Sequence, residues 1–193
     1  MSPEPPEPPS VAAAKPPTRW RRWLWENLQI VVIALALVVV IRTFIAEPRY
    51  IPSDSMAPTL AVGDRVVVEK VSYYFRPPAD GEIVVFEPPP QLQAQGYQAS
   101  QAFIKRVVGT PGEWLAVQEQ TVLVNGEPQQ EGYIAEPPAY ELGPVVIPPH
   151  YLFVMGDNRN NSNDSHLWGL LPERNVIGRA TFRFWPLGRL GWV

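Results

Sequence analysis

The sequence predicts a mainly β protein: a single N-terminal transmembrane helix followed by an antiparallel β-sheet domain. Two observations predict this class. Residues 30–41, IVVIALALVVVI, contain no polar side chain, which indicates a hydrophobic helix. After about residue 46, short segments rich in Val, Ile, Phe, Tyr and Thr alternate with Gly and Pro turns, and no long helical period appears. The 193 residues suffice for one compact domain with appendages.

Residues 1–18, MSPEPPEPPSVAAAKPPT, precede the apolar run and are rich in proline. Such a segment has too few large apolar side chains to bury a core. We therefore expect a disordered or extended tail, and we place the first domain boundary after residue 18.

Residues 19–46 are predicted to form a basic and aromatic flank and the membrane anchor. The uncharged run from Asn27 up to Arg42 is short for a spanning helix, which needs ~20 mostly apolar residues, but the flanking tryptophans and Arg42 extend it. A buried soluble helix and a cleaved signal peptide are the alternatives, and no small-x-small cleavage site follows the run. The basic residues before the run favour a cytoplasmic N-terminus, which places a β-rich domain, residues 47–193, on the extracytoplasmic side.

Six segments of this domain are predicted strands, and Asn125-Gly126 predicts a two-residue hairpin turn. The segments are residues 64–75, 81–87, 101–109, 113–127, 150–156 and 176–185. Between them, residues 88–100 are predicted to form a surface loop, and residues 128–149 an irregular excursion from the sheet.

The composition excludes several classes of function. A net charge of −3 gives no electrostatic basis for binding nucleic acid. The absence of cysteine excludes disulfides, thiolate zinc sites and cysteine nucleophiles. The sequence contains no G-x-S-x-G, S-x-x-K or H-E-x-x-H motif, and we expect neither a metal nor a cofactor.

Two serines, Ser53 and Ser55, lie between prolines in IPSDSMAPTL, residues 51–60. This stretch is either a surface turn or a rigid support for a nucleophile. A serine can be deprotonated by a neutral lysine, which must be desolvated because a free lysine has a pKa of ~10.4. Lys105, in AFIKRVVG, shares a strand face with apolar residues, so it is either the exposed end of an edge strand or a buried base. Lys70 is not excluded, although an adjacent glutamate favours its protonated form.

The two histidines, His150 and His166, are weaker candidates for the base of a Ser-His-Asp triad. His166 lies in GDNRNNSNDSHLWG, residues 156–169, which is rich in turn-forming residues. The spacing does not fit a calcium loop, because Arg159 stands where the third-position ligand is required.

Four sequence blocks follow the apolar run in the order PSDSMAPTL, IKRVVGTPGE, GDNRNNSNDSHLWG and VIGRA. With the anchor, from about residue 26 to about residue 185, they resemble the type I signal peptidases, membrane-bound serine–lysine proteases of bacteria and organelles. The resemblance implies a signal-peptidase-like catalytic domain that removes signal peptides from exported preproteins after small-x-small sequences. We expect a monomer whose partners are these signal peptides and the lipid membrane.

The resemblance implies roles for four residues by position. Ser55 matches the nucleophile, and Lys105 matches the general base, which later protonates the leaving amine. Ser53 matches a serine whose hydroxyl forms the oxyanion hole together with the backbone N–H of Ser55. Ser162 matches a serine that orients the lysine amine.

Asp164 matches an acidic residue that supports the site through an ion pair, for which we expect Arg106 or another nearby arginine. His166 departs from the family pattern, because an arginine often occurs at its position. Asp54 also departs, because many members carry a small or neutral residue beside the nucleophile. The short excursion at 128–149 indicates that the accessory β-domain of larger members is reduced.

The substrate is expected to bind in an extended form beside exposed strands, as in β-augmentation. The expected substrate-binding residues are Tyr50, Ile51, Leu60, Phe103 and Ile104. Shallow apolar pockets would accept Ala and exclude larger side chains. Met56 is expected at an apolar edge that faces the membrane.

Two alternative functions differ in what they require of Ser55. A self-cleaving serine–lysine regulator of related fold is disfavoured by the anchor and by the lack of a DNA-binding segment. A membrane-anchored, non-catalytic β-domain that binds exported chains would need an inert Ser55.

Overall fold

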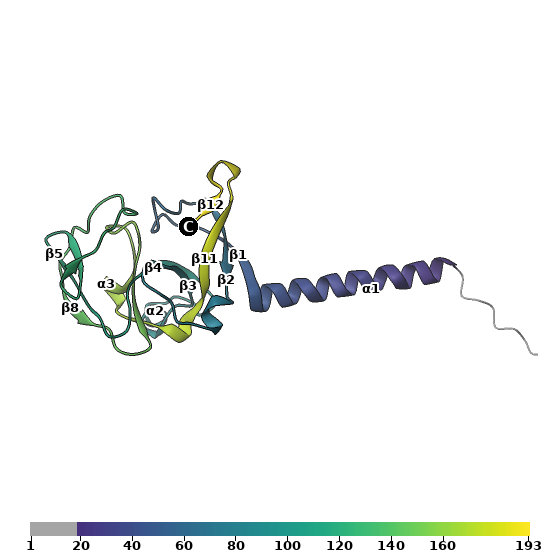
Figure 1. Ribbon diagram of the computed structural model, residues 1–193, viewed down its shortest axis with the longest axis horizontal. Coiled ribbons are helices and arrows are strands. Elements are labelled where there is room, and N and C mark those ends of the chain that lie inside the picture. The colour runs from purple at the N-terminus through teal and green to yellow at the C-terminus, as the bar shows by residue number, and fades with distance from the viewer. Residues whose placement is uncertain (1–18) are drawn as a thin grey trace, which may run out of the picture. The chain divides into compact units, whose positions relative to one another are not determined.

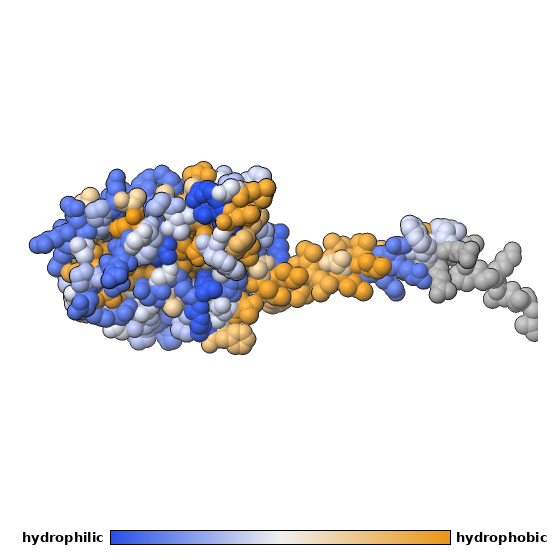
Figure 2. All heavy atoms as spheres, turned by 45° about the horizontal axis from the view of Figure 1, so that its top comes forward, coloured by the Kyte–Doolittle hydropathy of each residue, from blue (hydrophilic) through white to orange (hydrophobic). Residues whose placement is uncertain are grey.

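The computed structural model describes residues 19–193, and the predicted proline-rich tail lies outside this part of the chain. Helix α1 (Arg19–Val40) continues into the short π-helical segment η1 (Ile41–Ile45). The span Trp23–Ile45 has a mean hydropathy of 2.7 and is long and apolar enough to cross a membrane. Its apolar side chains are exposed, and the face visible in Figure 2 is hydrophobic along this span. The predicted apolar helix is confirmed.

The chain divides into two compact units between Val39 and Val40, and the second unit holds the β-domain. Its large sheet has eight antiparallel strands, in the order β1-β2-β11-β3-β4-β9-β10, with β12 paired to β11. The strands are β1 (Ala46–Tyr50), β2 (Arg65–Glu69), β3 (Ile83–Phe86), β4 (Phe103–Gly109), β9 (Tyr151–Met155), β10 (Leu171–Pro172), β11 (Val176–Trp185) and β12 (Gly191–Trp192). The mainly antiparallel β class is therefore confirmed.

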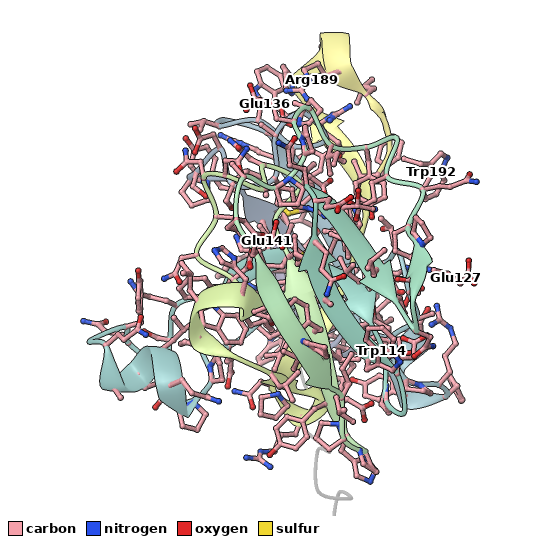
Figure 3. The ribbon with its side chains drawn as sticks, turned by 90° about the vertical axis from the view of Figure 1, so that its left-hand side faces the viewer. Trp114, Glu127, Glu136, Glu141, Arg189 and Trp192 are labelled. Atoms are coloured by element: carbon pink, nitrogen blue, oxygen red, sulfur yellow. The ribbon has the colours of Figure 1, made fainter. Side chains whose placement is uncertain are left out.

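A smaller antiparallel sheet of four strands has the order β7-β6-β5-β8. Its strands are β5 (Trp114–Gln118), β6 (Thr121–Val124), β7 (Glu127–Pro128) and β8 (Leu142–Val146). Figure 1 shows β5 and β8 at the end of the β-domain opposite β1 and β2, and Figure 3 views the small sheet with Trp114 and Glu127 labelled. Asn125 and Gly126 join β6 to β7 with φ angles of 53° and 87°, as the predicted hairpin turn requires.

All six predicted strand segments contain strands, but two connecting regions differ from the prediction. The excursion at 128–149 is not wholly irregular, since β8 lies within it and pairs with β5. Gly143 and Pro144 obscure the strand pattern in the sequence, and an edge strand tolerates the missing N–H of Pro144. The predicted loop at 88–100 contains the short helix α2 (Pro90–Ala94), which buries Leu92 in the core.

Strand β3 is buried on both faces and separates two parts of the core. Its Val84 and Phe86 belong to one hydrophobic cluster, and its Ile83 and Val85 belong to another. The second cluster also contains Met56, which is fully buried. The expectation that Met56 faces the membrane is therefore wrong, because this side chain packs inside the β-domain.

Candidate active site

Ser55 lies in a turn between β1 and β2 that is stabilised by backbone hydrogen bonds and by buried side chains. Ala57 N donates to Asp54 O at 2.9 Å, and Leu60 N donates to Met56 O at 2.8 Å. Met56 and Leu60 are fully buried, so the residues after Ser55 are fixed by packing. The backbone is therefore held while the hydroxyl of Ser55, with the residue 8% exposed, stays within reach of the surface.

Lys105 lies on β4, fifty residues after Ser55, and its Nζ is 2.7 Å from Ser55 Oγ. The central strand β3 flanks it through the pair Val84 and Lys105. Lys105 is only 3% exposed. Of the two interpretations left open by the sequence, the structure selects the buried lysine over the exposed end of an edge strand.

Burial controls the charge of Lys105. Desolvation lowers the pKa of its amine to about 8, while the negative charges of Asp164 and Asp157 act in the opposite direction. At pH 7 about a tenth of the lysines are then neutral, compared with about one in 2,500 for an ordinary lysine. A neutral amine at this position can accept the proton of Ser55 directly.

Ser53 Oγ lies 3.3 Å from Ser55 Oγ. Its hydroxyl is thus on the same side of the turn as the reacting oxygen. A donor in this position can stabilise negative charge that develops on a carbonyl oxygen attacked by Ser55.

A cleft of about 300 Å³ adjoins the two reacting groups. It is lined by Pro52, Ser53, Ser55, Tyr97, Gln101, Ala102, Phe103, Ile104 and Lys105. Phe103 and Ile104 were expected here. The sequence does not single out Tyr97, because the segment that carries it has the composition of a surface loop. Its Oη accepts a hydrogen bond from Asn163 Nδ2 at 3.2 Å, and its ring packs edge-on against Phe103.

The other three expected substrate-binding residues do not line this cleft. Ile51 and Leu60 are buried in the hydrophobic cluster under the turn, and Tyr50 is 57% exposed at the end of β1. Leu60 therefore stabilises the turn by packing in the core and does not form a wall of the cleft.

The expected ion pair between Asp164 and Arg106 is absent from the described residues. Asp164 is the N-cap of α3 (Ser165–Trp168), and its carboxylate lies 2.6 Å from His166 Nδ1. It also accepts a hydrogen bond from Gly156 N at 2.8 Å. Arg106 instead donates to both carboxylate oxygens of Asp157, at 2.8 and 2.6 Å. The helix cap and the strand register, which decide these partners, are not visible in the motif.

Ser162 lies beside the site, but its predicted bond to the lysine is not formed. Its Oγ is buried and has no hydrogen-bond partner among the described residues. A side chain on Gly156 would collide with both Ser162 Oγ and the carbonyl oxygen of Ser55. Glycine at 156 therefore allows Ser162 to approach the backbone of Ser55 closely.

The remaining candidates for the base have partners elsewhere. Lys70 Nζ donates to Glu47 Oε2 at 3.0 Å. His150 is exposed beside Glu173, and His166 is held by Asp164 as described. Within residues 19–193, no group of three or more His, Cys, Asp or Glu side chains could hold a metal ion.

The unexplained charge of Asp54 also has a partner. Asn161 Nδ2 lies 3.2 Å from each of its carboxylate oxygens, and Asn158 Nδ2 lies 3.3 Å from its carbonyl oxygen. Asp54 therefore ties the turn that carries Ser55 to the loop at 156–165.

The chain is similar to signal peptidases over most of its length. The family model described as signal peptidase, peptidase S26, matches residues 23–185. The chain is 57% identical to the probable signal peptidase I-1 of Synechocystis sp., over 91% of this chain and 89% of that protein. It is 50% identical to a signal peptidase I of Leptolyngbya laminosa, over 98% and 93%. It is 48% identical to the probable thylakoidal processing peptidase 2 of Arabidopsis thaliana, over 83% of this chain and 44% of that protein. With the apolar helix, the β-domain and these matches, the chain belongs to the signal peptidase family, peptidase S26.

Proposed function

We propose that this protein is a signal peptidase I in which Ser55 is the nucleophile and Lys105 is the general base. One observation carries the proposal: a buried lysine amine lies 2.7 Å from a serine hydroxyl. Burial lowers the pKa of that amine to about 8, so a useful fraction is neutral at physiological pH.

In the proposed reaction, Ser55 Oγ attacks the scissile carbonyl carbon and its proton passes to Lys105 Nζ. The carbonyl oxygen becomes an oxyanion, to which Ser53 donates a hydrogen bond. The C–N bond then breaks, and the Lys105 ammonium protonates the leaving amine. Water, deprotonated by the same lysine, hydrolyses the acyl-enzyme and regenerates the Ser55 hydroxyl.

The first half of β4 supports binding of an extended substrate. Residues Phe103, Ile104 and Lys105 pair with β3 on one side, while the pairing with β9 begins only at Arg106. The other edge of these three residues is thus open beside the cleft, where a peptide strand can add. A cleft of about 300 Å³ favours small side chains before the scissile bond.

We place the N-terminus of the anchor in the cytoplasm and the β-domain on the extracytoplasmic side, because basic residues precede the apolar run. Both reacting groups come from one chain, which supports a monomer as the catalytic unit. Protease protection in sealed membrane vesicles of known orientation tests the topology, and cleavage of the β-domain from the cytoplasmic face would contradict it.

Cleavage of a short peptide with an Ala-x-Ala sequence by the detergent-solubilised full chain tests the proposal. The wild type is expected to cut after the second Ala, and Ser55→Ala is expected to abolish cleavage. Ser72→Ala, a matched change outside the cleft, should remain active. A wild-type protein that binds the peptide without cleaving it would favour the non-catalytic alternative.

A further inference from the structure

We infer that a second, polar pocket binds the substrate segment that follows the scissile bond. This inference rests on the proposed function, since it needs a peptide bond placed at Ser55. The pocket has a volume of about 470 Å³ and lies on the loop at 156–165. It is lined by Ala139, Tyr140, Arg159, Asn160, Asn161, Ser162, Asn163, His166 and Leu167. Glu136 and Glu141, labelled in Figure 3, bracket the segment that contributes Ala139 and Tyr140.

Two polar atoms of this lining lack partners. Ser162 Oγ and Tyr140 Oη are buried and make no hydrogen bond to any described residue. The whole residue Ser162 is 8% exposed. Both oxygens are shielded from the surface of the pocket, so the polar groups that a ligand meets there are the exposed amide side chains of Asn160 and Asn161. An amide side chain offers both donors and an acceptor, which a peptide main chain can pair with.

The walls of the pocket are fixed before any ligand enters. The ring of Tyr140 stacks on His166, with a centroid separation of 4.1 Å and an interplanar angle of 12°. His166 is held in turn by Asp164. Asn160 Oδ1 accepts a hydrogen bond from Ala139 N at 2.7 Å, which joins the two segments that line the pocket. A rigid wall of this kind reduces the entropy lost on binding.

The pocket adjoins the reacting serine through the loop at 156–165. Asn158 N donates to the carbonyl oxygen of Ser55 at 3.1 Å, and Asn161 bonds the carboxylate of Asp54. Asn163, which lines the pocket, also bonds Tyr97, which lines the cleft. The loop at 156–165 thus lines the pocket and is hydrogen-bonded both to the turn that carries Ser55 and to Tyr97 of the cleft.

The side chains that line the two sites differ in chemistry. Aromatic and aliphatic side chains dominate the cleft, which suits the small apolar residues before the scissile bond. Amides and hydroxyls dominate the pocket. Arg159 and His166, which also line it, are already paired with Glu131 and Asp164. We therefore expect an uncharged, polar stretch of polypeptide as the occupant.

Two peptides test the inference. Both carry the same residues before the scissile bond, but one ends two residues after it and the other extends for eight polar, uncharged residues. Ala139→Trp fills the pocket, whereas Ala135→Trp changes an exposed alanine of the same segment that does not line it. The ratio of kcat/KM for the long peptide to that for the short one is measured for each variant.

We expect the wild type to prefer the long peptide by roughly tenfold, since contacts remote from the reacting bond raise kcat/KM. Ala139→Trp should reduce the ratio to near one, and Ala135→Trp should leave it unchanged. A ratio that is the same in all three proteins would overturn the inference. If Ala139→Trp shows no cooperative thermal unfolding, Leu167→Trp at another part of the rim decides by the same ratio. Failure of the proposed function is distinguishable, because the short peptide would then be cleaved equally by wild type and Ser55→Ala.

Discussion

Lys105 and Arg106 are neighbours on β4, and both are buried cations, but they meet opposite environments. Arg106 donates to both oxygens of the buried Asp157 and to the carbonyl oxygen of Gly81. Lys105 has no carboxylate in hydrogen-bond contact among the described residues, and its Nζ contacts Ser55 Oγ. Since successive strand residues point to opposite faces, one strand holds both a paired and an unpaired cation. The pairing, rather than the burial, separates the structural cation from the reactive one.

The paired region extends beyond Arg106. The guanidinium of Arg106 lies 4.0 Å from the ring centre of Tyr133, and Arg159 approaches the same ring at 5.9 Å. Arg159 in turn makes two hydrogen bonds to Glu131. This network holds the segment at 131–133 and the loop at 156–165 beside the lysine without giving Lys105 a partner that would keep it charged.

The largest expected effect is on catalysis, from Lys105→Met. We expect kcat on an Ala-x-Ala peptide to fall about 10³-fold or more, because the base and the proton donor are both lost. The free energy of unfolding at pH 7 should not fall, since the change removes a buried cation without a carboxylate partner. Peptide cleavage and thermal unfolding in detergent measure the two effects. Full activity in this variant would contradict the assignment of the base.

The same variant tests how deprotonation of Lys105 contributes to the free energy of unfolding. The folded protein loses the Lys105 proton near pH 8, while the unfolded chain keeps it up to a pKa of ~10.4. Wild-type stability should therefore gain a contribution as pH rises from 8 to 10, and Lys105→Met should lack that contribution. Identical pH dependences in this range would contradict the lowered pKa of Lys105.

Arg106→Met is expected to act on stability instead. It leaves Asp157 buried and unpaired, which should cost about 3–5 kcal/mol in the free energy of unfolding. The matched control is Arg76→Met. The Arg76 side chain, which pairs with Glu82, is 41% exposed, so this substitution should lower the free energy of unfolding by only about 0–1 kcal/mol. Denaturant unfolding of both variants checks the difference. Equal losses would mean that the pair with Asp157 has no special structural role.

Ser53→Ala should lower kcat by about 10²–10³-fold, because one donor to the oxyanion is lost while the nucleophile and the base remain. KM should change little, and Ser53→Thr should restore part of kcat by returning the hydroxyl. A loss in KM alone, with kcat intact, would show that Ser53 contacts the substrate rather than the transition state.

The smallest effect is expected from Asp54→Asn. The side chain is exposed and its contacts are with Asn161, so kcat/KM should change by less than about threefold. The charges that raise the pKa of Lys105 are those of Asp164 and Asp157, so the pH profile should not move. A shift of the profile by half a pH unit or more would show that Asp54 acts on the lysine after all.

The sequence predicted the apolar helix, the antiparallel class and both members of the proposed dyad. Ser55 and Lys105 could be predicted because two signals coincided. One is a physical requirement, a lysine in an apolar strand, and the other is the set of motifs that resemble a known family. The partners of Asp164 and Arg106 could not be predicted from the sequence, because they depend on a helix cap and on strand register. The role of Asp157 could not be predicted for a related reason. Next to glycine, Asp157 has the sequence pattern of a turn former, and its burial depends on the arginine of a distant strand.

The most direct test of the central claim is the pH dependence of kcat/KM on a peptide without titratable side chains. With Lys105 as the base, log kcat/KM should rise by one unit per pH unit below a midpoint near 8 and level off above it, because only the neutral amine accepts the proton of Ser55. A profile that is flat between pH 6 and 9, or a midpoint near the ~10.4 of an exposed lysine, would contradict the account.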